Sequence, residues 1–289
     1  MMIVIDTLIQ GILLGGLYAL FATGLSLIFG ITRLVNLAHG DFMILGAFAV
    51  LIGVDAIGLP ILLSAVLAAI FMFIVGYVLQ SVLLNRTLGK DILPPLLVTF
   101  GLSIILQNGM LEAFSADTQR LNFGGLSEAS LPLGGGLAVG VVPLMTFGSA
   151  ILVILFLNWL FYRTETGRAF RATSDNPEIA QLMGIDNNRI FSLAMALALV
   201  VVAIAGLYLG ARATFDPLIG PSRLIFAFEA VIIGGLGSFW GTLSGGSVLG
   251  LAQTVGAQIS PEWQTLSGHI VFLIVLVLRP RGLFPRHVD

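Results

Sequence analysis

The sequence predicts an all-α polytopic membrane protein with about eight or nine transmembrane helices, some of them broken or rich in glycine. Two observations lead to this fold class. Hydrophobic residues make up 57% of the 289 residues and charged residues only 10%, whereas an average soluble domain carries about 25% charged residues. Several charge-free stretches also reach the roughly 20 apolar residues that a helix needs to cross a bilayer. We expect residues 1–289 to form one membrane domain without a soluble domain.

Short polar segments divide the chain into successive apolar runs. Prolines mark two of the helix starts, since Pro60 opens one run and Pro94 and Pro95 suit the first turn of another. The longest polar stretch, residues 115–140, is rich in Gly and Ser and predicts a loop with a small hairpin. The spans are expected at residues 7–30, 42–57, 60–84, 94–114, 141–162, 189–211 and 263–278.

One apolar run is too long for a single span. Residues 224–259 contain one charged residue, Glu229, and are interrupted by GGLGS (234–238) and WGTLSGG (240–246). The glycines of GGLGS predict either close helix packing or a broken helix that lines a cavity. The number of crossings in this run therefore stays open between the two interpretations.

The positions of Lys and Arg predict the orientation, because short cytoplasmic loops are enriched in them. Four arginines surround residues 163–189 and three lie in the tail 279–286, so both segments and the C-terminus are expected in the cytoplasm. The loop 115–140 and the N-terminus are then expected outside. If the first part of the run 224–259 is a re-entrant half-helix that does not cross the membrane, one of these loops lies on the opposite side of the membrane from the predicted one.

A short charged segment, RATSDNPEIAQLMGID (171–186), lies between two long apolar runs. Asn176 is a good N-cap, Pro177 a good first helical residue, and Glu178 favours the positive end of a helix. Gly184 is a suitable residue for ending it. These residues predict a helix of about two turns over 177–183.

This short helix needs a surface, because a helix of this length is marginal alone. Its residues Ile179, Leu182 and Met183 fall at i, i+3 and i+4 and form one apolar stripe. The helix lies either on lipid headgroups, as an interfacial helix, or against a soluble cytoplasmic partner.

Three further segments carry a resemblance to a known family. GLYALFATGLSLIFGITRLVNLAHGDFMILGAF (16–48) closely resembles the branched-chain amino acid permeases of the LivH type, which are membrane-spanning subunits of ATP-binding-cassette importers. AVIIGGLGSFWGTLSGG (230–246) and RPRGLFPR (279–286) resemble the same family. The resemblance covers nearly the whole chain, in order and at similar spacing.

The segment RAFRATSDNPEIAQLMGID (168–186) resembles the cytoplasmic coupling loop of these permeases, expected here at about 163–189. Glu178-Ile179-Ala180, with Gly184 four residues later, loosely matches their Glu-Ala-Ala…Gly motif, and Ile179 replaces the first alanine. The resemblance implies that this helix transmits ATPase closure to the membrane spans. The implied coupling residues are Asn176, Pro177, Glu178, Ile179, Ala180, Leu182, Met183 and Gly184.

The resemblance also implies an assembly in the bacterial inner (plasma) membrane. Its other parts are a second homologous permease subunit, two cytoplasmic ABC ATPase subunits and an extracytoplasmic solute-binding protein; no nucleic acid is involved. The sequence has no GxxxxGK[ST] phosphate-binding loop, so it cannot hydrolyse ATP by the usual P-loop route. We expect this subunit to be a transport subunit and not an enzyme, with no cofactor of its own. ATP and Mg are expected on the ATPase subunits.

The family implies branched-chain amino acids as the cargo, but the residues do not single them out. A largely apolar conduit with few polar groups also suits other amino acids, amides or urea. A stand-alone secondary transporter is another alternative, and it would need coupling carboxylates deep in the spans. Glu229 is the one residue that favours it.

Polar groups at membrane depth are candidates for the translocation pathway. Asn36 and His39 lie in LVNLAHGDF (34–42) at i, i+3, and Glu229 could attract an ammonium group. The alternatives are a membrane-edge turn for the first two and, for Glu229, pairing with Arg223 or a partner subunit, or a place near the headgroups. Gln107 and Asn108 are expected to make interhelical hydrogen bonds. No metal site is expected, because the three histidines lack ligand spacing and cysteine is absent.

Overall fold

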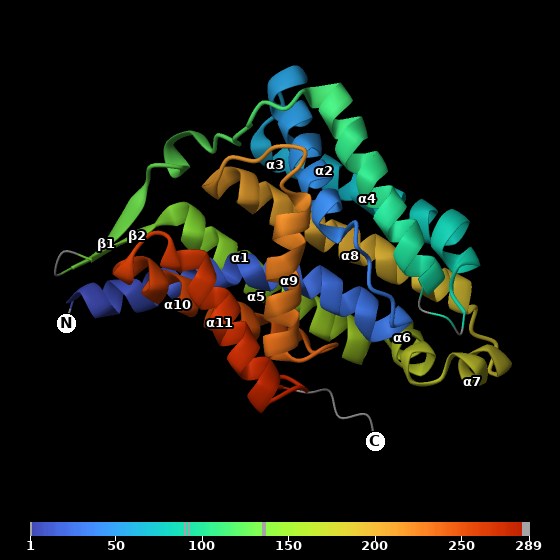
Figure 1. The fold of residues 1–289 in the computed structure, drawn as a ribbon. Coiled ribbons are helices and arrows are strands. Elements are labelled where there is room, and N and C mark those ends of the chain that lie inside the picture. The colour runs from blue at the N-terminus through green and yellow to red at the C-terminus, as the bar shows by residue number, and fades with distance from the viewer. Residues whose placement is uncertain (1, 90, 92, 135–136, 285–289) are drawn as a thin grey trace.

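The structure is a computed structural model, and it describes residues 2–89, 91, 93–134 and 137–284. Eleven α-helices and one antiparallel hairpin form this part of the chain (Figure 1), so the predicted all-α fold class is confirmed. The helices are α1 (Met2–Thr32), α2 (His39–Leu51), α3 (Ile61–Val78), α4 (Leu93–Phe114), α5 (Val141–Arg163), α6 (Glu165–Asp175), α7 (Pro177–Leu182), α8 (Asn187–Arg212), α9 (Gly220–Gly234), α10 (Phe239–Ile259) and α11 (Trp263–Leu278). The strands are β1 (Ser130–Gly134) and β2 (Leu137–Gly140).

Six helices in the described residues are long and apolar enough to cross a membrane, or up to seven if α9 and α10 count as one bent span. They are α1, α2 with its π-helical extension to Ala56, α3 with its irregular extension to Arg86, α4, α5 and α8. α11 is apolar but shorter. This number is roughly in line with the predicted eight or nine, and the chain is a multi-pass membrane protein.

α1 lies at the centre of the bundle. In its most apolar stretch 83% of the residues are buried, against 17% in α4, which presents its apolar side chains outward. α1 packs most extensively against α10 and also contacts α5, α8 and α9. Outward-facing apolar helices around a buried one are the arrangement that a lipid solvent requires, because lipid tails solvate apolar side chains.

Glycines allow α1 and α10 to approach closely. Gly11 and Gly15 on α1 face Gly246 and Gly250 on α10, two GxxxG pairs that meet backbone to backbone. A methyl group on Gly250 would lie 2.3 Å from the Gly11 carbonyl oxygen. Small residues at helix crossings are the common device of membrane bundles, where van der Waals contact replaces the hydrophobic effect.

The long run 224–259 forms two helices, α9 and α10, bent by 114° at the GGLGS segment. Gly235 and Gly237 have φ values of 108° and 79°, which glycine adopts without strain. A methyl group on Gly234 would lie 2.0 Å from the Gly241 carbonyl oxygen. The segment therefore combines both predicted features, a helix break and close backbone packing.

The two ends of the bundle differ. At one end lie the start of α1 and the β1–β2 hairpin, and the Gln10 side chain donates to the Ala138 carbonyl oxygen at 3.5 Å. α6 and α7 lie at the opposite end, to the right in Figure 1. There Ser174 Oγ donates to the Gly30 carbonyl oxygen at 2.5 Å, which holds α6 against the end of α1.

The polar break predicted at 31–41 is shorter in the structure, since helix occupies both of its ends. α1 continues to Thr32, and the chain then doubles back along it so that His39, the first residue of α2, contacts the Phe21 carbonyl oxygen through Nε2 at 3.1 Å. Thr32 comes eleven positions after Phe21, about 16 Å along the helix. His39 therefore lies well inside the bundle, and α2 begins there.

Candidate functional site

The short helix α7 forms where the sequence predicts it. Asn176 Oδ1 accepts a hydrogen bond from the Ile179 amide at 3.1 Å, which caps the helix, and Pro177 occupies its first turn. Gly184 has a φ of 86°, and the Ile185 amide donates to the Ala180 carbonyl oxygen at 3.0 Å. Both predicted boundary signals are therefore present, and they fix the helix to a few residues.

The apolar stripe of α7 points away from the protein. Ala180 is buried, whereas Ile179, Leu182 and Met183 are 57%, 86% and 78% exposed. The helix thus rests on its own chain through the small alanine and leaves its three large apolar side chains uncovered. Three large apolar side chains together on a surface are typical of an interaction site.

The position of α7 is fixed by hydrogen bonds to the start of α8. Asn187 Nδ2 donates to the Pro177 carbonyl oxygen at 2.7 Å. Asp186 caps α8, because its Oδ1 accepts from the amides of Asn188 and Arg189 at 3.0 and 3.3 Å. The Asn187 bond therefore links α7 directly to α8, one of the most buried helices of the bundle.

A helix that we did not predict, α6, supports α7 from the other side. Thr164 Oγ1 accepts from the Gly167 amide at 3.0 Å and caps α6. Phe170 is buried and stacks on Phe161 of α5 with 5.2 Å between ring centroids. The signal was present in the sequence, as a threonine cap followed by Glu165 in the first turn.

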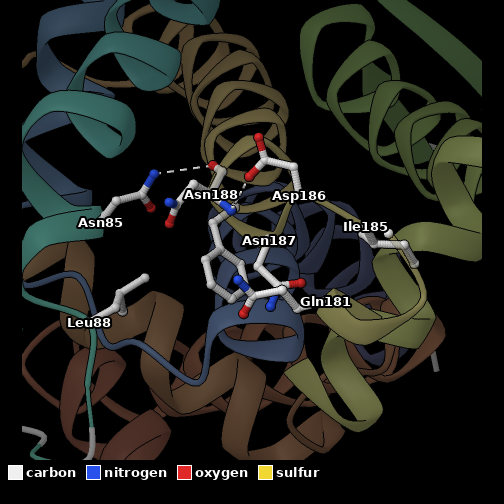
Figure 2. Close-up of a pocket in the computed structure, with 9 residues that line it drawn as sticks. Asn85, Leu88, Gln181, Ile185, Asp186, Asn187 and Asn188 are labelled. Carbon is white, nitrogen blue, oxygen red and sulfur yellow. Dashed lines mark hydrogen bonds between the residues drawn. The ribbon is translucent and has the colours of Figure 1, made fainter. Parts of the chain in front are cut away.

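A pocket of about 450 Å³ lies beside α7 (Figure 2). Asn85 and Leu88 line it from the segment after α3, and the α7–α8 turn lines it from the other side. Asn85 Nδ2 donates to the Asn188 carbonyl oxygen at 3.1 Å, which links the two walls. The other lining residues are Gln181, Gly184, Ile185, Asp186, Asn187 and Phe191. The pocket and the exposed stripe thus share one end of the molecule.

The candidate pathway residues Asn36 and His39 are both completely buried. Asn36 Oδ1 accepts from the Ala38 amide at 3.0 Å, and His39 contacts α1 as described. Asn36 Nδ2 and His39 Nδ1 have no hydrogen-bond partner among the described residues. The structure brings these two residues together on the doubled-back segment, apart from Glu229.

Glu229 pairs with a residue that the sequence did not suggest. His269 Nδ1 on α11 forms a hydrogen bond with Glu229 Oε1 on α9, whereas Arg223, the predicted alternative partner, lies over the ring of Phe226. The His–Glu pair joins residues 40 positions apart, and no short-range pattern in the sequence marks it.

Asp41 is the centre of another polar group that the sequence did not assign. Ser103 Oγ donates to its Oδ2 at 2.5 Å and Gln107 Nε2 donates to its Oδ1 at 3.0 Å. The expected interhelical bond is therefore confirmed for Gln107 but wrong for Asn108, which donates to the Ile104 carbonyl oxygen of its own helix. These bonds tie α4 to the start of α2.

Among the described residues, no group of three or more His, Cys, Asp or Glu side chains could hold a metal ion. The arginines near α7 make local contacts, such as the Arg168–Glu165 ion pair at 3.1 Å, which is exposed and contributes little to stability. The structure thus has an exposed apolar helix at one end and several hydrogen-bonded polar groups within the bundle.

The fold defines the class: a multi-pass helical membrane protein. The family model described as "Branched-chain amino acid transport system / permease component" matches residues 7–278, and the chain belongs to this family. The resemblance found in the sequence is thereby confirmed.

Several curated relatives are similar over almost the whole chain. The high-affinity branched-chain amino acid transport system permease protein BraD of Pseudomonas aeruginosa is 28% identical, over 98% of this chain and 96% of the relative. LivH of Escherichia coli strain K12 is 28% identical with the same coverage. The probable LivH of Methanocaldococcus jannaschii is 30% identical, over 92% and 86%. These relatives are transport permeases, in agreement with the prediction that this chain is not an enzyme.

Proposed function

We propose that this chain is the membrane-spanning subunit of an ATP-driven importer that carries branched-chain amino acids across the bacterial inner membrane. Separate cytoplasmic ABC ATPase subunits hydrolyse ATP, a second permease subunit completes the pathway, and an extracytoplasmic binding protein delivers the cargo. The names of the relatives support the cargo and the transport system.

The observation that carries the proposal is the exposed apolar stripe of α7. Ile179, Leu182 and Met183 project from a helix that is capped at its start and hydrogen-bonded to α8. A subunit docked on this stripe would contact α7 and transmit its own movement through α7 to α8. In the proposed assembly α7 is the coupling helix, and the side of the membrane on which it and the C-terminus lie is the cytoplasm.

Co-purification tests this role. The tagged chain is purified in mild detergent with its ATPase subunits, and Leu182→Asp together with Met183→Asp is compared with Leu126→Asp at the hairpin end. We expect the double variant to recover at least tenfold less ATPase, because charged side chains cannot be buried in an apolar contact, and the hairpin variant to recover it normally. Absence of any ATPase with the unaltered chain would refute the importer assignment.

A second cargo class is supported by one specific observation. The fructose import permease protein FrcC of Rhizobium meliloti is 27% identical over 86% of this chain and 71% of the relative. The same type of permease with another small polar solute is therefore the alternative. Uptake of radiolabelled leucine against fructose by the reconstituted transporter distinguishes the two.

A further inference from the structure

Five polar side chains gather around the ring of Phe226, and we call them the polar cluster: Tyr18, Arg223, Glu229, Gln253 and His269. They come from α1, α9, α10 and α11, and each lies within its helix. The Phe226 ring lies 5.4 Å from the ring of Tyr18 and 6.1 Å from that of His269, measured between centroids. The Arg223 guanidinium lies over it at 5.9 Å.

The polar cluster is only partly satisfied by its own hydrogen bonds. Tyr18 donates to Gln253 Oε1 at 2.5 Å, and His269 bonds Glu229 Oε1. Three buried atoms of the cluster, Arg223 Nε, Glu229 Oε2 and Gln253 Nε2, have no hydrogen-bond partner among the described residues. Buried polar atoms in proteins are normally hydrogen-bonded. Free donors and a free acceptor in one cluster are therefore suited to a ligand that carries both kinds of group.

The polar cluster reaches the surface of the bundle. Glu229 is only 3% exposed, but the side chain of its partner His269 is 38% exposed. His269 is the seventh of the sixteen residues of α11, so it opens at mid-helix, where α11 lies beside α9 (Figure 1). Ionisable groups at membrane depth face a bundle interior or a water-filled cavity and avoid lipid. The part of the α9–α11 face around Glu229 and His269 is therefore unsuited to lipid.

The geometry points to a binding subsite for the zwitterionic end of an amino acid in the polar cluster. The ammonium group is bound by Glu229, the carboxylate by Arg223, and the aliphatic side chain lies on the Phe226 ring. A guanidinium is suited to a carboxylate because it donates two parallel hydrogen bonds. Arg223 and Glu229 are six residues apart, about 9 Å along α9, and the Arg223 guanidinium lies over the ring of Phe226, which comes between them in the sequence.

This inference rests on the proposed function and adds to it the chemical group that the pathway binds. Such a subsite binds cargo that carries both an ammonium group and a carboxylate in preference to cargo that carries one of these groups or neither. A sugar offers neither an ammonium group nor a carboxylate, so a permease built for a sugar would not need this pair of charges.

The first experiment asks whether the face is in water. The chain has no cysteine, so a single thiol can be placed one turn before Glu229 with Ile225→Cys. Leu152→Cys on α5 is the matched control, because both positions are exposed and apolar. In the complete transporter reconstituted in nanodiscs, a charged methanethiosulfonate reagent is expected to modify the first variant at least tenfold faster. Equal rates would overturn the inference.

The second experiment asks what binds. Millimolar leucine is expected to slow modification of Ile225→Cys at least threefold, whereas 4-methylpentanoate and 3-methylbutylamine, which each lack one charged group, do not. Adding Glu229→Gln or Arg223→Gln should abolish the protection, and adding Glu112→Gln on α4 should preserve it. Protection that is absent, or unchanged by Glu229→Gln in a complex that still elutes with its ATPase subunits, would overturn the inference.

Leucine uptake by the unaltered transporter, measured in parallel, keeps the two proposals separate. If the unaltered transporter takes up leucine but leucine gives no protection, the subsite is refuted and the importer stands. If neither leucine uptake nor ATPase association occurs, the proposed function itself is refuted.

Discussion

Buried polar side chains connect the helices of this bundle in pairs. Thr23 of α1 and Thr242 of α10 are 2.9 Å apart between their hydroxyl oxygens, and Ser149 of α5 and Tyr208 of α8 are 2.6 Å apart. Such bonds between membrane helices contribute about 0.6 kcal/mol on average. We expect the contribution of a hydrogen bond to stability to be larger where the acceptor is a carboxyl group, as at Asp41.

Removing one donor to Asp41 should destabilise the protein measurably. Gln107→Leu deletes the bond to Asp41 Oδ1 and should lower the free energy of unfolding by roughly 0.6–1.7 kcal/mol, the range from the average to the largest value for hydrogen bonds between membrane helices. Asn108→Leu, which removes only a bond within α4, is the control. Apparent melting temperatures in detergent would test this, and equal values for the two variants would contradict it.

The cap of α7 should matter for transport more than for stability. Asn176→Ala removes the acceptor for the Ile179 amide and should destabilise α7 by about 1 kcal/mol. We expect faster hydrogen exchange at residues 178–183 and reduced uptake. Asn176→Asp, which keeps the cap, should restore both. Unchanged exchange in the alanine variant would show that the neighbouring contacts hold α7 without its cap.

At the scale of helices, the crossing of α1 and α10 depends on the absence of side chains. Gly11, Gly15, Gly246 and Gly250 each lie so close to the other helix that a methyl group would approach its backbone within 3.0 Å. Backbone atoms cannot move aside as a flexible side chain can. The same packing continues at Gly245, where a methyl group would lie 2.0 Å from the Ala230 carbonyl oxygen of α9.

Gly250→Ala should therefore destabilise the bundle, by about 1–3 kcal/mol, the cost of overpacking. Gly148→Ala on α5 is the matched control, since nothing lies within 4 Å of its added methyl group. The control should be neutral or more stable by up to about 1 kcal/mol, because alanine favours helix over glycine. Thermal unfolding and the monodisperse fraction in detergent measure both, and a destabilised control with a stable Gly250→Ala would contradict the packing.

In the molecule as a whole, the two ends of the bundle carry different structural elements. The hairpin end holds the start of α1, and the opposite end carries α6 and α7. The C-terminal segment returns to the break between α9 and α10, where the amides of Leu283 and Phe284 donate to the carbonyl oxygens of Ile233 and Gly234 at 2.8 and 2.9 Å. This segment is therefore held against the break between α9 and α10.

The sidedness of these ends can be measured with single thiols. We expect Ser127→Cys, next to the hairpin, to react with an impermeant maleimide in intact cells, and Leu182→Cys on α7 to react only in inverted vesicles. The reason is that arginines cluster around α6 and α7, and the enrichment of Lys and Arg in short cytoplasmic loops predicts the cytoplasmic side for them. Reaction of both thiols from the same side would contradict the arrangement.

The fold class, most of the long helices and the boundaries of α7 could be predicted from the amino-acid sequence. These features depend on local composition: apolar length selects membrane helices, and Asn176 and Gly184 act on backbone groups a few residues away. The protein family could also be recognised from the sequence, because its motifs are continuous segments of the chain.

Which polar groups meet could not be predicted, because it depends on how the helices pack. Glu229 and His269 are 40 residues apart and Asp41 and Gln107 are 66 apart, and apolar helices carry no pattern that fixes their neighbours. α1 shows this most clearly, since it is apolar all round and buried by several helices at once. The doubled-back segment before His39 and the exposed stripe of α7 follow from the same cause: packing selects which side of a helix is covered, and packing joins residues that the sequence separates.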